Sequence, residues 1–104
     1  MVVIIWEYRV KPERVPEFEA IYGEHGVWAE LFQKGGSYLG TELLRSPNDP
    51  HHYMTIDRWR SDADYELFLS TWKKEYRNLD TQSEDLTAQE ISLGKWETNS
   101  DQTR

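Results

Sequence analysis

The sequence contains no cysteine. This absence excludes disulfide bonds, thiolate metal sites and a cysteine nucleophile, and it suits a protein of a reducing compartment. Basic residues are also scarce, because 12 Lys and Arg stand against 19 Asp and Glu and the formal net charge is −7. Since this charge repels phosphate backbones and anionic lipid surfaces, we expect neither a nucleic acid nor a membrane as a partner.

Long apolar runs are missing too. No stretch approaches the length of a transmembrane helix. The apolar run near the N-terminus, Val2–Trp6, is too short for the h-region of a signal peptide and has no basic residues before it. With 104 residues, the chain is expected to form a single domain. We therefore expect a soluble cytoplasmic protein.

Familiar catalytic signatures are absent as well. The chain has no G-x-S-x-G, P-loop, dinucleotide-binding or H-E-x-x-H motif, which leaves the usual hydrolase, nucleotide-binding and zinc-protease interpretations without support. His51 and His52 are adjacent, so on a strand their side chains would point to opposite faces and could not hold one metal ion together. Asp62 and Asp64 are explained as charges at a helix start. We predict no metal site and no cofactor.

What the sequence does contain is one pattern, strand then helix then strand, written twice. In chain order, the expected elements are Val2–Val10, Glu13–Lys34, Tyr38–Arg45, His52–Trp59, Ser61–Leu79 and Glu90–Trp96. The order βαββαβ is that of the ferredoxin-like fold. We therefore predict an α+β domain with a four-stranded antiparallel sheet and both helices on one face.

Local composition predicts where this pattern is interrupted. Gly23 and Gly26 each weaken the first helix by about 1 kcal/mol relative to alanine, so we expect a break or kink between them. The polar stretch from Leu79 to Thr87 is expected to be a connection, with a short extra helix as the alternative. The domain is expected to span residues 1–97, and residues 98–104, which lack an apolar anchor, are expected to form a flexible tail.

The first strand begins with apolar residues on both of its faces. Val2 and Ile4 alternate with Val3 and Ile5, which is typical of a strand that is covered on both sides. Since both helices would cover the same face of the sheet, something else must cover the other face. A second copy of the chain is the simplest cover, so we predict a homodimer.

Aromatic residues are abundant, with 5 Trp, 6 Tyr and 3 Phe. Several lie on the strand and helix faces that would enclose the space between the helices and the sheet. They are Trp6, Tyr8, Trp28, Phe32, Phe68, Trp72 and Tyr76. Such rings can line a flat apolar slot for an aromatic ligand. The alternative is that they fill the core of a small domain, as helical aromatic stripes usually do.

His25 lies between the two glycines that interrupt the first helix. In one interpretation it stands at the mouth of the slot and acts as an acid, a base or a hydrogen-bond donor. In this interpretation, Trp28 and Trp72 face each other across the slot. In the other interpretation, His25 is an ordinary residue of a surface loop.

Parts of the sequence resemble a known family. The segments are Ile4–Val10 followed by Lys11-Pro12, the strand Gly36–Leu44, and above all Tyr53–Ser61. Together they resemble the antibiotic biosynthesis monooxygenase (ABM) family of dimeric α/β barrels, over Val2 to about Trp96. The resemblance implies a homodimer whose sheets face each other, with a pocket in each subunit between sheet and helices.

The resemblance also implies a reaction. Characterised members oxygenate aromatic polyketides with O2 and without metal or flavin, and the anion of the substrate supplies the electrons. Other members degrade haem, with an Asn on the first strand, a Trp on the second helix and an iron-binding His near the end of that helix. The corresponding positions here are Trp6, Phe68 and Asn78, so the resemblance does not extend to haem degradation.

The sequence thus predicts a cofactor-independent monooxygenase acting on a phenolic aromatic molecule. The expected catalytic residues are His25, Tyr8 and Tyr76. The expected substrate-binding residues are Trp6, Trp28, Phe32, Phe68 and Trp72. The alternative is a non-catalytic ligand-binding or stress-associated protein of the same fold, because a fold does not determine an activity.

Overall fold

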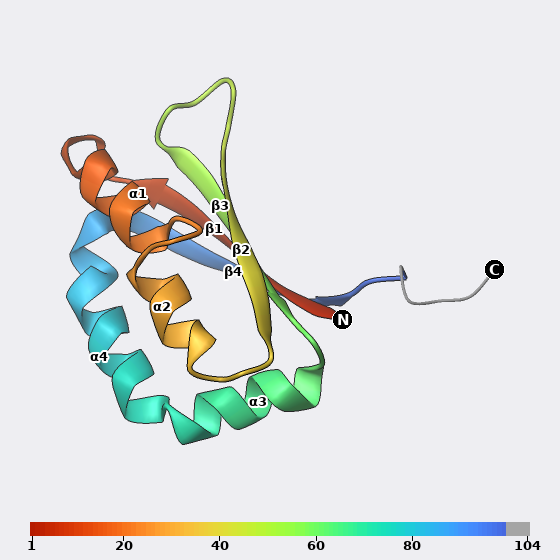
Figure 1. The fold of residues 1–104 in the computed structure, drawn as a ribbon. Helices are drawn as coiled ribbons and strands as arrows, with labels where there is room; N and C mark the ends of the chain where they lie inside the picture. Colours follow the sequence, from red (N-terminus) through yellow and green to blue (C-terminus); the bar gives the residue numbers. More distant parts are fainter. Residues whose placement is uncertain (100–104) are drawn as a thin grey trace.

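The structure, a computed structural model, describes residues 1–99. Its centre is a four-stranded sheet in the order β2-β3-β1-β4, with every neighbouring pair antiparallel. The strands are β1 (Val2–Val10), β2 (Tyr38–Arg45), β3 (His52–Trp59) and β4 (Thr87–Glu97). The helices lie along one face of this sheet (Figure 1). The predicted ferredoxin-like α+β fold is confirmed. Of the predicted tail, residues 100–104 lie outside the described residues.

The predicted break in the first helical segment is confirmed. A 3-10 turn, η1 (Pro12–Arg14), leads into α1 (Val15–Tyr22), and α2 (Val27–Gln33) follows the interruption. At Gly26 a Cβ atom would lie 2.5 Å from the carbonyl oxygen of Ile21 and 2.6 Å from that of Ala20. The chain can turn between α1 and α2 only because Gly26 has no side chain.

The second helical segment differs from the prediction of one helix over Ser61–Leu79. It consists of α3 (Asp62–Thr71) and α4 (Lys73–Ser83), and a 3-10 turn, η2 (Glu84–Leu86), follows. Ser61 caps α3 by accepting a hydrogen bond from the backbone N–H of Asp64 at 3.1 Å. The backbone leaves the helical conformation at Trp72, where φ is −109° and ψ is 28°. At this bend the chain changes direction sharply from α3 to α4 (Figure 1).

The fourth strand is longer than predicted, because it begins at Thr87 instead of Glu90. Its pairing with β1 shifts register between Ile5 and Trp6. Gly94 has φ of 84° close to this irregularity, a conformation that favours glycine. The shift sets which β4 side chains face the helices.

The core lies between the sheet and the helices. Burial along β3 alternates strictly, with Tyr53, Thr55, Asp57 and Trp59 on the helix side. Among the largest fully buried side chains are Tyr53, Trp59, Phe18 and Phe68. One charged residue, Asp57, thus sits in an otherwise uncharged row at the centre of the sheet.

The other face of the sheet has no helix over it (Figure 1). Strand alternation places Ile5 of β1 and Ile56 of β3 on this face, where they are neighbours in register. The exposed large apolar residues of the same face are Leu44, Ile91, Leu93 and Trp96. No helix in the described part of the chain combines the length and the hydropathy that a membrane span requires.

Candidate functional site

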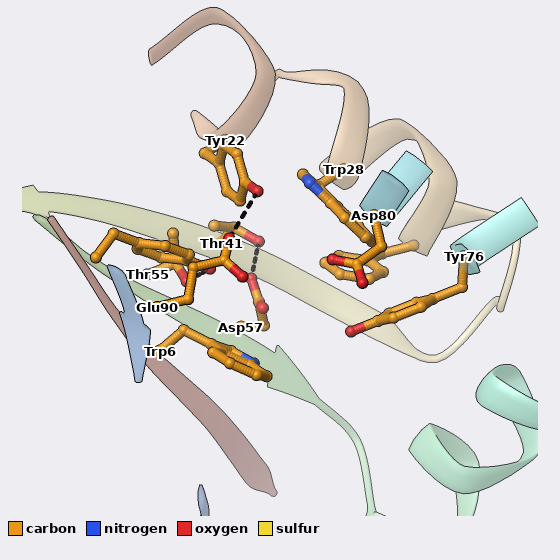
Figure 2. Close-up of a pocket in the computed structure, with 11 residues that line it drawn as sticks. Trp6, Tyr22, Trp28, Thr41, Thr55, Asp57, Tyr76, Asp80 and Glu90 are labelled. Carbon is orange, nitrogen blue, oxygen red and sulfur yellow. Dashed lines mark hydrogen bonds between the residues drawn. The ribbon is translucent and has the colours of Figure 1, made fainter. Parts of the chain in front are cut away.

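A cavity of about 280 Å³ opens between the sheet and helices α1, α2 and α4 (Figure 2). Its lining comes from all four strands and from these three helices. The lining residues are Trp6, Tyr8, Tyr22, Trp28, Phe32, Thr41, Thr55, Asp57, Tyr76, Asp80 and Glu90. Most of the wall is aromatic, and the polar atoms are concentrated on the strands and at one rim. This combination is the usual composition of a small-molecule site.

The aromatic wall is built from rings in mutual contact. Trp28 and Tyr76 pack edge to face with 4.9 Å between their ring centroids, and Tyr8 and Tyr22 do so at 5.0 Å. Tyr76 therefore occupies the place across from Trp28 that the sequence analysis gave to Trp72, and that prediction is wrong. The five predicted residues that do line the cavity are Trp6, Tyr8, Trp28, Phe32 and Tyr76.

Three predicted site residues lie elsewhere. Phe68 is buried in the core, where its ring packs 4.9 Å from that of Trp59. Trp72 is half-buried at the bend between α3 and α4, and the ammonium group of Lys34 lies 5.1 Å from its ring. The side chain of His25 is 90% exposed, and it does not line the cavity. Its placement matches the alternative of a surface loop residue.

Asp57 forms the polar floor of the cavity. Its residue surface is 8% exposed, and the hydroxyl group of Thr41 donates a hydrogen bond to its Oδ1 at 2.6 Å. Because Thr41 donates its only hydroxyl proton in this bond, the hydroxyl of Tyr38 must be the donor in the 2.5 Å contact between Tyr38 and Thr41. Within residues 1–99, no hydrogen bond reaches Oδ2 of Asp57. That oxygen is the one available to a ligand.

Burial changes the acidity of this carboxyl group. Loss of hydration raises the pKa of Asp57 to about 6, although the hydrogen bond from Thr41 acts in the opposite direction. A carboxyl group with such a pKa is mostly ionised at neutral pH and is still basic enough to accept a proton. This is the range in which general bases are effective.

The phenol groups of the cavity are poor bases. Burial raises the pKa of Tyr8, Tyr22 and Tyr76 above the usual range of a phenol, so all three stay protonated at neutral pH. The hydroxyl of Tyr8 is paired with that of Thr55 at 3.1 Å. Tyr76 and Tyr8 can therefore act as hydrogen-bond donors, whereas proton acceptance falls to Asp57.

Two further carboxylates, Asp80 of α4 and Glu90 of β4, stand at the rim of the cavity (Figure 2). The hydroxyl of Tyr22 lies 3.5 Å from Oε1 of Glu90, a long contact for a hydrogen bond. Partial burial, followed by the charge of Asp80, raises the pKa of Glu90. The indole N–H of Trp28, another lining residue, is buried without an acceptor in the described chain.

Reasoning from the sequence missed the polar half of this site. The missed residues are Tyr22, Thr41, Thr55, Asp57, Asp80 and Glu90. For Asp57 a signal was present, because it alternates in phase with Tyr53 and Trp59 and so had to face the helices. Thr41 and Glu90 reach the cavity through the strand register, which the sequence alone does not fix. In residues 1–99, no group of three or more His, Cys, Asp or Glu side chains is placed to hold a metal ion.

Similar structures are found among proteins of known fold. SnoaB, a cofactor-independent oxygenase from Streptomyces nogalater, aligns in a mutant form with a TM-score of 0.79 and 16% identity, over 99% of this chain and 97% of that chain. A crystal structure of an antibiotic biosynthesis monooxygenase aligns with a TM-score of 0.65 and 19% identity, over 94% and 98% of the two chains. A mutant of MhuD with two manganese protoporphyrin IX bound per active site aligns with a TM-score of 0.68 and 19% identity, over 97% of each.

These sequence identities are low, so the structural similarities support the fold alone. No curated protein sequence matches the chain. The family model for antibiotic biosynthesis monooxygenase, however, matches residues 1–78, which is most of the chain. The helix break at Gly26, the hairpin of β2 and β3, and Asp57 all lie within this matched region. The chain therefore belongs to the antibiotic biosynthesis monooxygenase family.

Proposed function

We propose that this protein is a cofactor-independent monooxygenase that oxidises a phenol-like aromatic molecule in the cavity between sheet and helices. Membership of the family supports the class of reaction. The observation that carries the proposal is the buried carboxylate of Asp57, which lies at the floor of an aromatic cavity and has a pKa of about 6. The aromatic wall binds a ring by stacking, and the carboxylate lies where a hydroxyl group of that ring would point.

In the proposed reaction, Oδ2 of Asp57 accepts the proton of the substrate hydroxyl. Thr41 donates a hydrogen bond to Oδ1 and accepts one from Tyr38, and this chain of bonds fixes the direction of Oδ2. The substrate anion then donates electrons to O2. Overall, the substrate loses two hydrogen atoms and gains one oxygen atom, and the second oxygen atom of O2 leaves as water. The enclosing rings keep bulk water away from the reactive anion.

The aromatic residues and the phenols have separate roles in this proposal. Trp6, Trp28 and Phe32 bind the ring of the substrate, because their side chains form the apolar walls. Tyr76 and Tyr8 donate or relay hydrogen bonds, since both remain protonated at neutral pH. His25, which the sequence analysis favoured as the base, has no role in binding or chemistry because it lies outside the cavity.

Haem is a poor fit to this cavity. Among the described lining residues there is no histidine, cysteine or methionine to ligate the iron and no Lys or Arg to pair with the haem carboxylates. The three tyrosines of the lining could ligate iron only as phenolates, and burial raises their pKa and keeps them protonated at neutral pH. Its three carboxylates would instead repel them. The residues present therefore give no support to haem degradation, in agreement with the mismatches at Trp6, Phe68 and Asn78.

The test is oxygen uptake by purified protein with a panel of phenolic aromatic compounds. Asp57→Asn keeps the size and shape of the side chain, so we expect folding to persist and turnover to fall on the order of 10²-fold or more. His25→Ala is the matched control and should retain the turnover of the unmodified protein. Full activity of Asp57→Asn would refute the assignment of the base. Saturable binding of these compounds with no oxygen uptake would instead favour the non-catalytic alternative.

A further inference from the structure

The charges of the cavity lining all have the same sign. Three carboxylates line it, Asp57 at the floor and Asp80 and Glu90 at the rim, and no Lys, Arg or His does. None of the three forms an ion pair within the described part of the chain. A concave site with apolar walls and charges of one sign concentrates a negative potential. No basic side chain among the described lining residues balances this potential.

Two polar atoms of the lining also lack hydrogen-bond partners within residues 1–99. Oδ2 of Asp57 receives no hydrogen bond from residues 1–99, and only 8% of the surface of Asp57 is exposed. The N–H of Trp28 is buried without an acceptor. The N–H of Trp59 is also buried without an acceptor in the described chain, although Trp59 lies outside the cavity, so the unpaired oxygen of Asp57 is the observation that indicates a ligand with a polar group of its own.

The aromatic walls suit a positive charge. The ring faces of tryptophan and tyrosine attract cations, most strongly where water is excluded. The chain uses this interaction outside the cavity, where the ammonium group of Lys34 lies 5.1 Å from the ring of Trp72 and that of Lys95 lies 5.5 Å from the ring of Tyr65. Inside the cavity, Trp6, Trp28 and Tyr76 provide further rings, and no Lys, Arg or His among the described lining residues lies with them.

The proposed reaction also favours a positive charge on the ligand. It passes through a substrate anion, and an anion next to Asp80 and Glu90 would be repelled with no positive side chain in the lining to offset the repulsion. A positive charge on the substrate itself would offset this repulsion. It would also complement the carboxylates before the reaction begins.

We propose that the ligand of this cavity is a cationic aromatic amine, with its ammonium group between the rim carboxylates and the ring faces and its phenol-like hydroxyl toward Asp57. The proposal that this amine is a substrate rests on the proposed monooxygenase function. The proposal that the cavity binds such an amine can be tested without turnover. It excludes acidic aromatic molecules, such as aryl carboxylates, as good ligands.

The test uses three probes that share a phenyl ring and a compact head group but differ in charge. They are phenyltrimethylammonium, tert-butylbenzene and benzenesulfonate. Their affinities are measured at pH 7.5 and low salt by the fluorescence change of the protein, which has Trp6 and Trp28 in the cavity, and by calorimetry. We expect the cation to bind roughly 10-fold more tightly than its neutral isostere and the anion to bind more weakly than both.

Two variants locate the effect. Glu90→Gln and Asp80→Asn should each weaken binding of the cation several-fold and leave the affinity for tert-butylbenzene unchanged, because each removes a charge and keeps the side-chain shape. Glu75→Gln is the matched control, since Glu75 lies exposed on the same helix as Asp80 but outside the cavity. It should bind all three probes as the unmodified protein does.

The outcomes separate the ligand class from the reaction. Equal affinities for the three probes, or tighter binding of the anion, would overturn the cationic ligand even if an Asp57-dependent oxidation of phenols were found. Unchanged cation binding in both rim variants would overturn it too. Conversely, the expected order of affinities with no oxygen uptake from any phenol would support the cationic ligand and contradict the monooxygenase function.

Discussion

At the scale of single residues, Asp57 is a buried carboxylate that can accept a proton but lowers the stability of the folded protein at neutral pH. A carboxyl group at the centre of a sheet loses most of its hydration, and one hydrogen bond from Thr41 compensates only in part. In the unfolded chain the pKa of this carboxyl group is close to its ordinary value of 3.8, whereas burial raises the pKa to about 6 in the folded protein. Between these two values the folded state binds more protons, so stability falls as pH rises.

This linkage predicts that Asp57→Asn stabilises the protein at neutral pH. The neutral amide avoids the cost of a buried charge, so the free energy of unfolding at pH 7.5 should rise by up to about 3 kcal/mol, the equivalent of roughly two pKa units. At pH 4 the gain should nearly vanish, because Asp57 is then protonated in the folded protein. Urea unfolding at both pH values measures the difference. A variant less stable than the unmodified protein at pH 7.5 would contradict the buried, ionised state of Asp57.

The same residue predicts the pH dependence of activity. With Asp57 as base, kcat/KM should fall below a pH of about 6, where the carboxylate becomes protonated. Thr41→Val removes the hydrogen bond that lowers the pKa of Asp57, so the acidic limb should move to higher pH. The other titratable groups near Asp57, which are Tyr8, Tyr38, Tyr65, Tyr76, Asp80 and Glu90, are unchanged in this variant, although Tyr38 loses its partner Thr41. An unmoved limb would show that another group controls it.

At the scale of elements, local patterns identified most of the fold, and tertiary contacts decided the rest. Alternation in β3 and the glycines around His25 are local signals, and both predictions from them are confirmed. The bend at Trp72 had no such signal, since Ser61–Leu79 contains neither glycine nor proline. It depends on how the two helices pack in the folded chain, which local sequence does not specify. It also turned Trp72 away from the cavity and brought Tyr76 into it.

For the candidate site, the aromatic wall was predicted from local patterns, and the carboxylates, which depend on tertiary contacts, were not. The aromatic wall was found because Trp28, Phe32 and Tyr76 follow helical spacing and Trp6 and Tyr8 follow strand spacing. The carboxylates were missed because an isolated Asp or Glu in a chain with 19 of them is indistinguishable from a surface charge until the strands are paired. Pairing in register is what brings Asp57 and Thr41 together.

The junction between α1 and α2 gives a prediction at this scale. Gly26→Ala places a methyl group against the carbonyl oxygens of Ala20 and Ile21, which are backbone atoms that cannot move aside cheaply. We expect the variant to lose about 1–3 kcal/mol of stability in chemical denaturation. His25→Ala, one position away and exposed, should change stability by less than about 0.5 kcal/mol. Equal stability of the two variants would mean that the junction rearranges without strain.

At the scale of the whole molecule, the open face of the sheet is the feature that a single chain leaves unexplained. Ile5, Ile56, Ile91 and Leu93 lie on a face that no helix of the described chain covers, and Trp96 is 57% exposed there. A contiguous apolar surface of this kind is normally covered by a partner. Since the same surface is present on every copy, two copies related by a two-fold axis can cover each other.

A homodimer formed through this face predicts a mass of about twice the 12.4 kDa chain in light scattering at micromolar concentration. Ile5→Glu should yield the single-chain mass, because an unpaired charge at the centre of an apolar interface costs several kcal/mol. Leu67→Glu is the matched control, since Leu67 is 63% exposed on α3, among the helices on the opposite side of the sheet. It should remain dimeric. Dissociation by Leu67→Glu and not by Ile5→Glu would place the interface on the helices, and a single-chain mass for the unmodified protein would refute the dimer.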